Sequence, residues 1–335
     1  LVDRPELIVD VEPGRRYAFR VTAVNAGGES FPSETLAACR VADERGRVLI
    51  VNGFDRVSGP VAMRSDSLAG FRMDLDGGVP DRMDISFVGP QRVFDLAMAR
   101  SNVDSLALGA CECDYETDVI GGNTFDYPSL HGRSICSTSA RAVEEGRVAL
   151  RGYDAVDLIL GKQRTTTIGR GIADAAFEVF PEALQSRLRR YLADGGALFA
   201  SGAYVLSDLA GQAASERERS FAGEVLHCRL DACRATGSGR VRVVTAHPGF
   251  SRGEYRFNTE YRPDCYVVER SDALEPVGRE AFAVMRYVDG DGTAAVASES
   301  AGRTFVAGFP FETVGGEVER DRMMRDVLDF LVKQR

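Results

Sequence analysis

The sequence has no tryptophan and only 3 histidines among its 335 residues, and its strongly apolar stretches are short. We attribute the missing tryptophan to genomic composition rather than to function. No apolar run approaches the ~18 residues of a membrane-spanning helix, so the sequence predicts no membrane span. No run of Lys or Arg exceeds two residues, and 50 acidic side chains outnumber 41 basic ones, for a net charge of −9. These features argue against nucleic acid or an anionic membrane surface as the partner.

Cysteine is also scarce, with 7 residues in the chain. Seven are too few for a disulfide scaffold, and because the number is odd at least one thiol stays outside any intrachain pair. The 44% of hydrophobic residues is too high for a disordered chain. Gly161-Lys162-Gln163 lacks the flanking glycine and Ser/Thr of a phosphate-binding loop, which disfavours nucleotide binding. We therefore predict a folded protein without a cofactor.

The first forty residues alternate apolar and polar side chains, over residues 7–11 and 17–24, as half-buried antiparallel strands do. Residues 13–34 closely resemble the end of a fibronectin type III domain. This resemblance implies the last strands of a β-sandwich over residues 1–43, with Tyr17 as its corner tyrosine. Alternatively, these strands pack on the domain that follows.

From residue 44 to 335 the pattern changes to short apolar runs alternating with helical segments, which is typical of a mainly parallel sheet covered by helices on both faces. Helices are expected over 181–192 and 322–332, and a hairpin within 282–309. A long insertion is expected at about residues 60–150. The expected strands cover residues 48–51, 156–160, 197–200, 240–244 and 304–308.

Ligands of open α/β sheets bind beyond the carboxyl ends of the strands, so the residues that follow each apolar run are candidates for a site. Ordinary loops of this fold carry polar residues too, so the pattern alone leaves both interpretations open. The candidates for substrate binding at this rim are Asp55, Arg56, Lys162, Gln163 and Tyr204, with Ser201 and Glu312 beside them.

The insertion ends in a polar segment, residues 115–132, that is rich in Gly, Asn, Asp and Tyr. Long loops in compact domains are usually functional, so Asn123 and Tyr127 are further candidates for substrate binding. His131 suits proton transfer, with Asp126 or Glu312 fixing its tautomer. Alternatively, these side chains only stabilise turns.

Ser201 lies at a strand-to-helix turn, the position at which α/β hydrolases and amidotransferases carry a nucleophile. The Gly-x-Ser-x-Gly pattern is absent, and no cysteine stands there. The hypothesis of a catalytic set of Ser201, His131 and an acid therefore competes with a structural serine that caps the next helix.

The cysteines suggest a second kind of site, a structural zinc held by Cys111, Cys113, Cys136 and His131. Structural zinc sites usually have C-x₂₋₄-C pairs, and this spacing does not match, so we predict no metal. Cys228 and Cys233 either form a disulfide or stay buried thiols.

Residues 48–60, 122–132, 156–163 and 308–312 resemble a family of secreted bacterial proteins in which a fibronectin type III domain precedes a domain similar to class I glutamine amidotransferases. Its members are commonly labelled xanthan lyase or N-acetylmuramoyl-L-alanine amidase. The resemblance implies a flavodoxin-like sheet, a polysaccharide or peptidoglycan substrate, and a periplasmic or extracellular location, although the chain contains no signal peptide. The chain departs from the amidotransferase pattern because Ser201 stands where the nucleophilic cysteine is usual.

Three functional hypotheses follow from these observations. The first is an exported hydrolase or lyase that acts on polysaccharide or peptidoglycan by acid–base chemistry, with His131, Asp126, Ser201 and Glu312 as catalytic residues. The alternative is a non-catalytic module that binds a glycan or a protein on the same scaffold. A cytoplasmic enzyme with the structural zinc is the third hypothesis.

Overall fold

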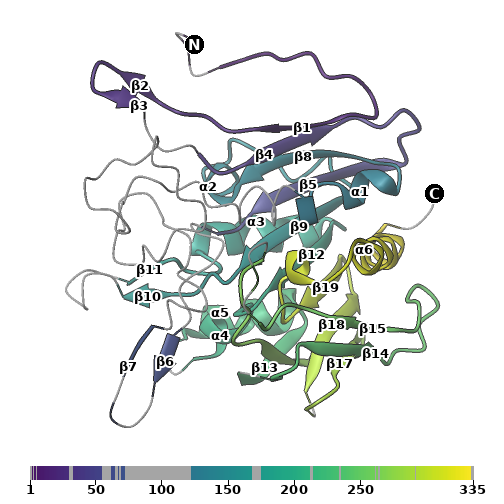
Figure 1. Ribbon diagram of the computed structural model, residues 1–335. Helices are drawn as coiled ribbons and strands as arrows, with labels where there is room; N and C mark the ends of the chain where they lie inside the picture. The colour runs from purple at the N-terminus through teal and green to yellow at the C-terminus, as the bar shows by residue number, and fades with distance from the viewer. Residues whose placement is uncertain are drawn as a thin grey trace.

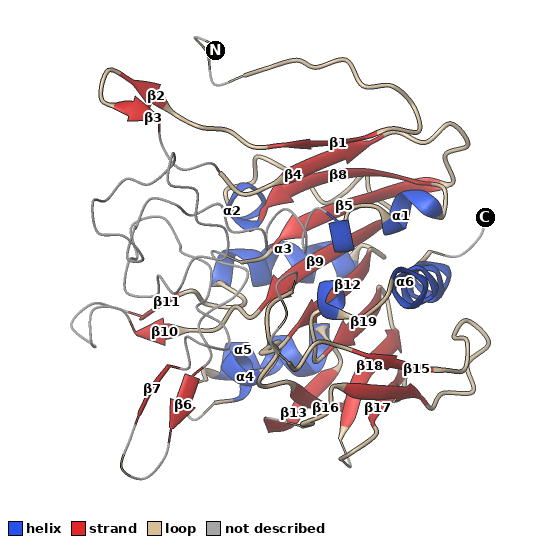
Figure 2. Cartoon of the chain, viewed as in Figure 1, coloured by secondary structure: helices blue, strands red, loops and turns tan. Residues whose placement is uncertain are grey.

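The computed structural model describes residues 6–29, 33–54, 122–167, 175–211, 214–233, 235–260, 265–290 and 292–332, with residues 2, 4, 62–64, 67, 69–71 and 262. A large mixed sheet forms the centre of the molecule, and helices lie on both of its faces (Figures 1 and 2). Within the described residues, no helix is both long enough and apolar enough to cross a membrane.

Thirteen strands make up the sheet. In chain order they are β1 (Arg16–Phe19), β4 (Leu36–Cys39), β5 (Gly46–Asn52), β8 (Arg133–Ser139), β9 (Ala155–Gly161), β12 (Ala197–Gly202), β13 (Cys228–Cys233), β14 (Arg240–Val243), β15 (Glu254–Arg256), β16 (Asp272–Pro276), β17 (Ala281–Tyr287), β18 (Thr293–Glu299) and β19 (Arg303–Ala307). The remaining strands form three short hairpins, β2 (Val24–Asn25) with β3 (Gly28–Glu29), β6 (Ala62–Arg64) with β7 (Ala69–Phe71), and β10 (Thr166–Thr167) with β11 (Ala175–Ala176).

The five central strands run parallel in the order β8-β5-β9-β12-β19. Numbered along the chain, that order is 2-1-3-4-5, the arrangement of flavodoxin-like sheets. Four of the five predicted strands, β5, β9, β12 and β19, lie in this parallel part. The fifth, β14, pairs antiparallel with β15 and β17 near the far edge. The predicted α/β architecture is therefore confirmed as a mixed sheet with a parallel centre.

The two longest helices cover opposite faces of this sheet. The helices are α1 (Tyr127–Leu130), α2 (Ala140–Glu144), α3 (Glu182–Ala193), α4 (Ser207–Ala210), α5 (Glu216–Ser220) and α6 (Glu317–Leu331), with a π-helix, η5 (Phe221–Val225), and a 3-10 turn, η6 (Phe311–Thr313). Leu184, Leu188 and Leu192 of α3 pack with Leu49 and Val51 of β5 on one face. Met323, Met324 and Val327 of α6 pack with Val48 and Ile50 on the other. Alternate residues of β5 thus face opposite cores, as the pleat of a strand requires.

The N-terminal strands extend the main sheet instead of forming part of a separate sandwich. Strand β1 pairs with β4, and β4 pairs with β8, where Cys39 lies opposite Ile135. The hydroxyl of Ser137 accepts a hydrogen bond from the Ala37 backbone N–H at 2.5 Å, which ties β4 to this edge. The Tyr17 hydroxyl accepts a hydrogen bond from the Glu12 N–H at 3.2 Å. In the described part of residues 1–43, the strands pack on the domain that follows, which is the second of the two arrangements that the sequence left open.

Strand β8 differs from the prediction, because residues 133–139 were expected to lie within the insertion. The strand runs parallel to β5 from Gly46 opposite Arg133 to Asn52 opposite Ser139. Residues 133–150 therefore belong to the α/β fold itself. The remainder of the predicted insertion, apart from residues 62–64, 67, 69–71 and 122–132, lies outside the described residues.

Candidate functional site

The carboxyl ends of the parallel strands bring several predicted residues together. Asn52, Ile159 and Ser201 are neighbours across β5, β9 and β12. The chain reverses its winding direction between β5 and β9, which is where flavodoxin-like sheets bind ligands. Lys162 follows β9 at this point. Asp55 and Arg56, predicted to follow β5, lie outside the described residues.

We call Lys162, Arg164, Tyr204 and Glu269 the Lys162 cluster. Lys162 Nζ lies 2.7 Å from Glu269 Oε2, and the two side chains are 1% and 14% exposed. The Tyr204 hydroxyl donates a hydrogen bond to Glu269 Oε1 at 3.0 Å. Arg164 lies over the Tyr204 ring, with its guanidinium carbon 5.1 Å from the ring centroid. Glu269 therefore joins two residues that the sequence places at different strand ends.

Among the described residues, positive charge exceeds negative charge around this cluster. Arg270 is exposed and, like Arg164, acts electrostatically to lower the pKa of Tyr204, against the larger effect of burial, which raises it. Asp208 accepts hydrogen bonds from the Thr165 N–H and hydroxyl at 2.6 and 2.7 Å. The three cations, Lys162, Arg164 and Arg270, thus face two carboxylates, Glu269 and Asp208. Gln163, also predicted to bind substrate, is buried next to Lys162.

Asp157 and Glu312, which we call the carboxyl pair, form a second polar group beneath the same strand ends. Glu312 is fully buried and accepts a hydrogen bond at Oε1 from the Tyr266 hydroxyl at 2.7 Å. Burial raises the pKa of Glu312 to about 7. Burial, and then the charge of Glu312, raise the pKa of Asp157 to about 8. The second oxygen of each carboxyl, Asp157 Oδ2 and Glu312 Oε2, has no hydrogen-bond partner among the described residues.

Ser201 and Asn123 help to hold the segment that carries Glu312. Ser201 is fully buried, and its hydroxyl accepts a hydrogen bond from the Phe311 N–H at 3.3 Å. Asn123 Nδ2 donates to the Glu312 carbonyl oxygen at 2.9 Å. The turn that follows β12 is fastened by Asp272, which accepts from the N–H groups of Leu206 and Ser207, both at 2.8 Å. Ser201 thus has a structural contact in the interior.

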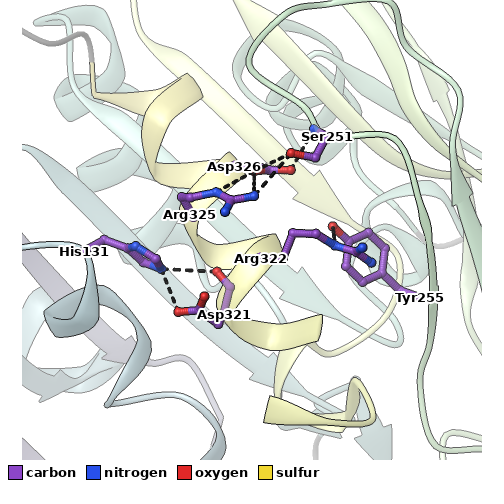
Figure 3. A network of polar contacts seen from close by, with 7 residues as sticks. All are labelled: His131, Ser251, Tyr255, Asp321, Arg322, Arg325 and Asp326. Atoms are coloured by element: carbon purple, nitrogen blue, oxygen red, sulfur yellow. Dashed lines mark hydrogen bonds and ion pairs between the residues drawn. The ribbon is translucent and has the colours of Figure 1, made fainter. Parts of the chain in front are cut away.

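The structure does not bring His131, Asp126 and Tyr127 to this rim. His131 directly precedes β8 and so lies at the amino end of the parallel strands, the opposite edge from Ser201. Its Nε2 lies 3.1 Å from Asp321 Oδ1 on α6 (Figure 3). Asp126 forms an ion pair with Arg16 of β1, and the buried Tyr127 accepts a hydrogen bond from Arg320 Nε at 2.7 Å. The predicted set of Ser201, His131 and an acid is therefore not assembled.

The polar contacts around His131 attach α6 to its neighbours. Figure 3 shows Asp326 turned toward Ser251 and Arg322 toward Tyr255. Asp326 Oδ2 accepts from the Ser251 N–H at 2.8 Å, and Arg322 Nε donates to the Tyr255 hydroxyl at 3.2 Å. These contacts, together with the His131 contact, link α6 both to the segment before β8 and to the region of β15. We assign them to packing of the helix.

Of the two alternatives for Cys228 and Cys233, a disulfide or buried thiols, the structure has free thiols, with Cys228 buried and Cys233 exposed. Cys228 and Cys233 stand at the two ends of β13. Five residues of extended chain separate their Cα atoms by about 16 Å, well beyond the reach of a disulfide. No group of three metal-binding side chains occurs within the described ranges. Cys111 and Cys113 of the hypothetical zinc site lie outside them.

The sequence did not indicate Asp157, Arg164 and Glu269 of the two clusters, nor Arg270 and Tyr266, which lie beside them. Asp157 carried a signal, because it is the one charged residue in an otherwise apolar run at 156–160. A charged side chain in a strand covered on both faces needs a special environment. Tyr266 and Glu269 had no such signal, since the segment that carries them is not a strand or a helix and follows no predicted strand.

No protein-family model and no curated protein sequence matches the chain. Among solved structures, it is similar over 58% of its length to a β-galactosidase from Bacillus circulans sp. alkalophilus, with 11% identity and a TM-score of 0.35. It is similar over 62% of its length to an exo-β-1,4-mannosidase from Opitutaceae bacterium strain TAV5, with 10% identity and a TM-score of 0.37. The chain spans only 24% and 30% of those two proteins. It is also similar, over 66% of its length, to a glutamine amidotransferase from Thermotoga maritima, of which it spans 94%, with 11% identity and a TM-score of 0.37.

Proposed function

We propose that this protein is a binding module for acidic polysaccharide, and that the ligand docks at the Lys162 cluster. The observation that carries the proposal is the excess of positive charge among the described residues at the carboxyl ends of β9 and β12, around the buried pair of Lys162 and Glu269. A polysaccharide ligand also requires the periplasmic or extracellular location, which is part of the proposal.

The buried charges and the more accessible charges of the site have different roles. Lys162 is already matched by Glu269, so the pair serves as a rigid base rather than as a contact for the ligand. Arg164 is partly exposed and is held over the ring of Tyr204, and Arg270 is exposed. A guanidinium group binds carboxylate in a two-pronged geometry, and a side chain that is already held in place loses less entropy on binding. We therefore assign recognition of uronic acid carboxylates to Arg164 and Arg270.

Replacing Arg164 by Ala is expected to weaken the binding of polygalacturonate about tenfold, because a charge-assisted hydrogen bond is lost. Isothermal titration calorimetry on the purified protein measures the effect. The matched control is Arg256→Ala, which removes an exposed arginine of β15 that forms an ion pair with Glu260 at 2.8 Å. Equal affinity of the Arg164→Ala and wild-type proteins would contradict the assignment.

A second candidate function rests on the carboxyl pair. Glycoside hydrolysis needs two carboxyl groups of which one is protonated near neutral pH, and the pKa values of about 8 and about 7 at Asp157 and Glu312 supply such an acid. In this alternative Asp157, which has the higher pKa, is the general acid, and Glu312 is the second carboxyl group. A substrate reaches the pair through a rearrangement of the segment that Ser201 and Asn123 hold. His131 has no part in the chemistry.

The release of reducing ends from polygalacturonate and from purified sacculi separates the candidates. A carboxyl-pair hydrolase loses at least a hundredfold in rate in Glu312→Gln, because general acid–base catalysis by the pair contributes about 10²–10⁴-fold. Its rate is unchanged in His131→Ala, since that change removes only a contact to Asp321. No product from the wild type, with binding retained, supports the binding module. A rate that falls in His131→Ala and not in Glu312→Gln contradicts both candidates.

A further inference from the structure

A pocket of about 620 Å³ lies at the amino end of the parallel strands, on the edge opposite the Lys162 cluster. One wall is the segment Gly146–Tyr153, which connects α2 to β9. The other wall is formed by the last turns of α3 and by residues 194–196, which lead into β12. Its volume is within the range of small-molecule sites and exceeds what a simple inorganic ion fills.

Three arginines line this pocket, Arg151, Arg187 and Arg190, against a single carboxylate, Asp194. Arg151 Nη2 lies 2.6 Å from Asp194 Oδ2, so these two charges offset each other. Within the described residues, Arg187 Nη2 donates only to the Glu144 carbonyl oxygen, at 3.5 Å. In a chain with a net charge of −9, the pocket therefore retains two positive charges.

The side chain of Glu145, next to Gly146 of the pocket wall, does not cancel this excess. Glu145 is engaged by Arg141 at 2.8 Å and by Arg147 at 2.7 Å. Arg190 has no side-chain hydrogen bond or ion pair within the part of the chain that the structure describes. The C-terminal carbonyls of α3 carry partial negative charge, which Arg190 in the last turn partly offsets. Arg187, one turn earlier, adds the further positive charge that makes the pocket attractive to an anion.

The pocket is built on a rigid base. Tyr191 is buried, and its hydroxyl donates to the carbonyl oxygens of Tyr153 and Ala197, both at 3.3 Å. Gly196 lies against this ring, since a Cβ there would stand 2.5 Å from Tyr191 Cζ. A Cβ at Gly146 would stand 2.6 Å from Arg187 Nη2. The glycines thus let the tyrosine and the guanidinium group occupy their present positions.

We infer that this pocket binds an anionic sugar of monosaccharide size, through its phosphate or carboxylate group, at Arg187 and Arg190. Guanidinium groups recognise both anions with paired hydrogen bonds, and the remaining volume accommodates the ring. This site is separate from the one in the proposed function, because it lies at the other ends of the same strands and shares no residue with the Lys162 cluster.

Titration calorimetry with glucose 6-phosphate, glucuronate, inorganic phosphate and glucose tests the inference. The wild type is expected to bind at least one of the two sugar anions and not glucose. The better of the two sugar anions identifies the anionic group, and inorganic phosphate shows how much the sugar ring contributes. The Arg187→Ala/Arg190→Ala double variant is expected to lose affinity more than about tenfold.

The matched control is Arg189→Ala on the same helix, because Arg189 pairs with Glu224 at 3.2 Å on the far side from the pocket. Its affinity is expected to equal that of the wild type. The affinity of Arg164→Ala for glucose 6-phosphate, which is not a uronic acid, is also expected to equal that of the wild type, which separates this site from the polysaccharide site. The inference is overturned if neither sugar anion binds at millimolar concentration, or if the double variant binds as tightly as the wild type while thermal unfolding shows it folded.

Discussion

The free energy of unfolding falls as the pH rises from about 5 to about 7, because the carboxyl pair keeps its protons in the folded state. The pKa of Asp157 is raised from 3.8 to about 8 and that of Glu312 from 4.5 to about 7. Below the ordinary pKa values of 3.8 and 4.5, which apply to the unfolded state, both groups are neutral in the folded and unfolded states. Their stabilising contribution is then complete. Between the lower and upper values only the unfolded state ionises, which costs up to about 1.4 kcal/mol per pH unit for each group. The loss is complete once the pH passes the raised values.

Asp157→Asn is expected to remove about half of this slope, because asparagine does not ionise in either state. Urea unfolding at several pH values between about 5 and 7 measures the free energy of unfolding of the variant and of the wild type. The difference between their pH slopes isolates Asp157, because the contributions of other groups with shifted pKa values, such as Asp272, cancel. The control is Asp231→Asn, which changes an exposed carboxyl on β13. A slope unchanged by Asp157→Asn contradicts the claim that this carboxyl is buried and protonated.

Lys162→Met is expected to cost about 3–5 kcal/mol of the free energy of unfolding, because it leaves Glu269 without its counter-charge in a buried position. The side chains are 1% and 14% exposed, so water can replace the lost ammonium group only in part. Lys162→Met combined with Glu269→Gln is expected to recover most of the loss, since no unpaired charge then remains. Urea unfolding of the two single variants and the double variant completes the cycle.

The control for that cycle is a surface ion pair of similar length. Arg240 Nη2 lies 2.8 Å from Glu254 Oε2, with side chains 51% and 42% exposed. Exposed pairs contribute at most about 1 kcal/mol, so Arg240→Ala is expected to have a small effect. If Lys162→Met costs no more than Arg240→Ala, the Lys162 cluster is not the rigid base that the proposed function needs.

The parallel centre of the sheet was predictable because its strands are buried on both faces. Such strands are continuous apolar runs, as in β5, β9, β12 and β19, and the glycines after α3 mark its end. The direction of these strands in turn predicted which side chains share a rim. Lys162 and Tyr204 do lie together there, and Asn123 reaches the segment of Glu312.

Strand β8 was not predictable in the same way, because its sequence, RSICSTS, contains three serines and a threonine. Two of these serines accept hydrogen bonds from the neighbouring N-terminal segment, Ser137 from Ala37 and Ser134 from Val41. The polar side chains are thus satisfied by tertiary contacts that no local pattern encodes. Missing this strand also led to the prediction that His131 faces the rim, whereas a residue just before a parallel strand lies at its amino end.

The contacts that complete the site come from a segment without regular structure. Tyr266 reaches Glu312, and Glu269 reaches both Lys162 and Tyr204. A segment without strand or helix periodicity gives no indication of which strand ends it will lie against, because its position depends on the antiparallel strands around it. Asp157 is the exception, since a carboxyl within a buried apolar run is visible in the sequence itself.

The most direct test of the proposed function compares two polymers that differ only in charge. Calorimetric titration of the wild-type protein with polygalacturonate and with its fully methyl-esterified form keeps the sugar backbone and removes the carboxylates. We predict binding of polygalacturonate that weakens as salt is added, and no binding of the ester, because Arg164 and Arg270 recognise the carboxylates. Equal binding of the two polymers, or binding of neither, would contradict the proposed function.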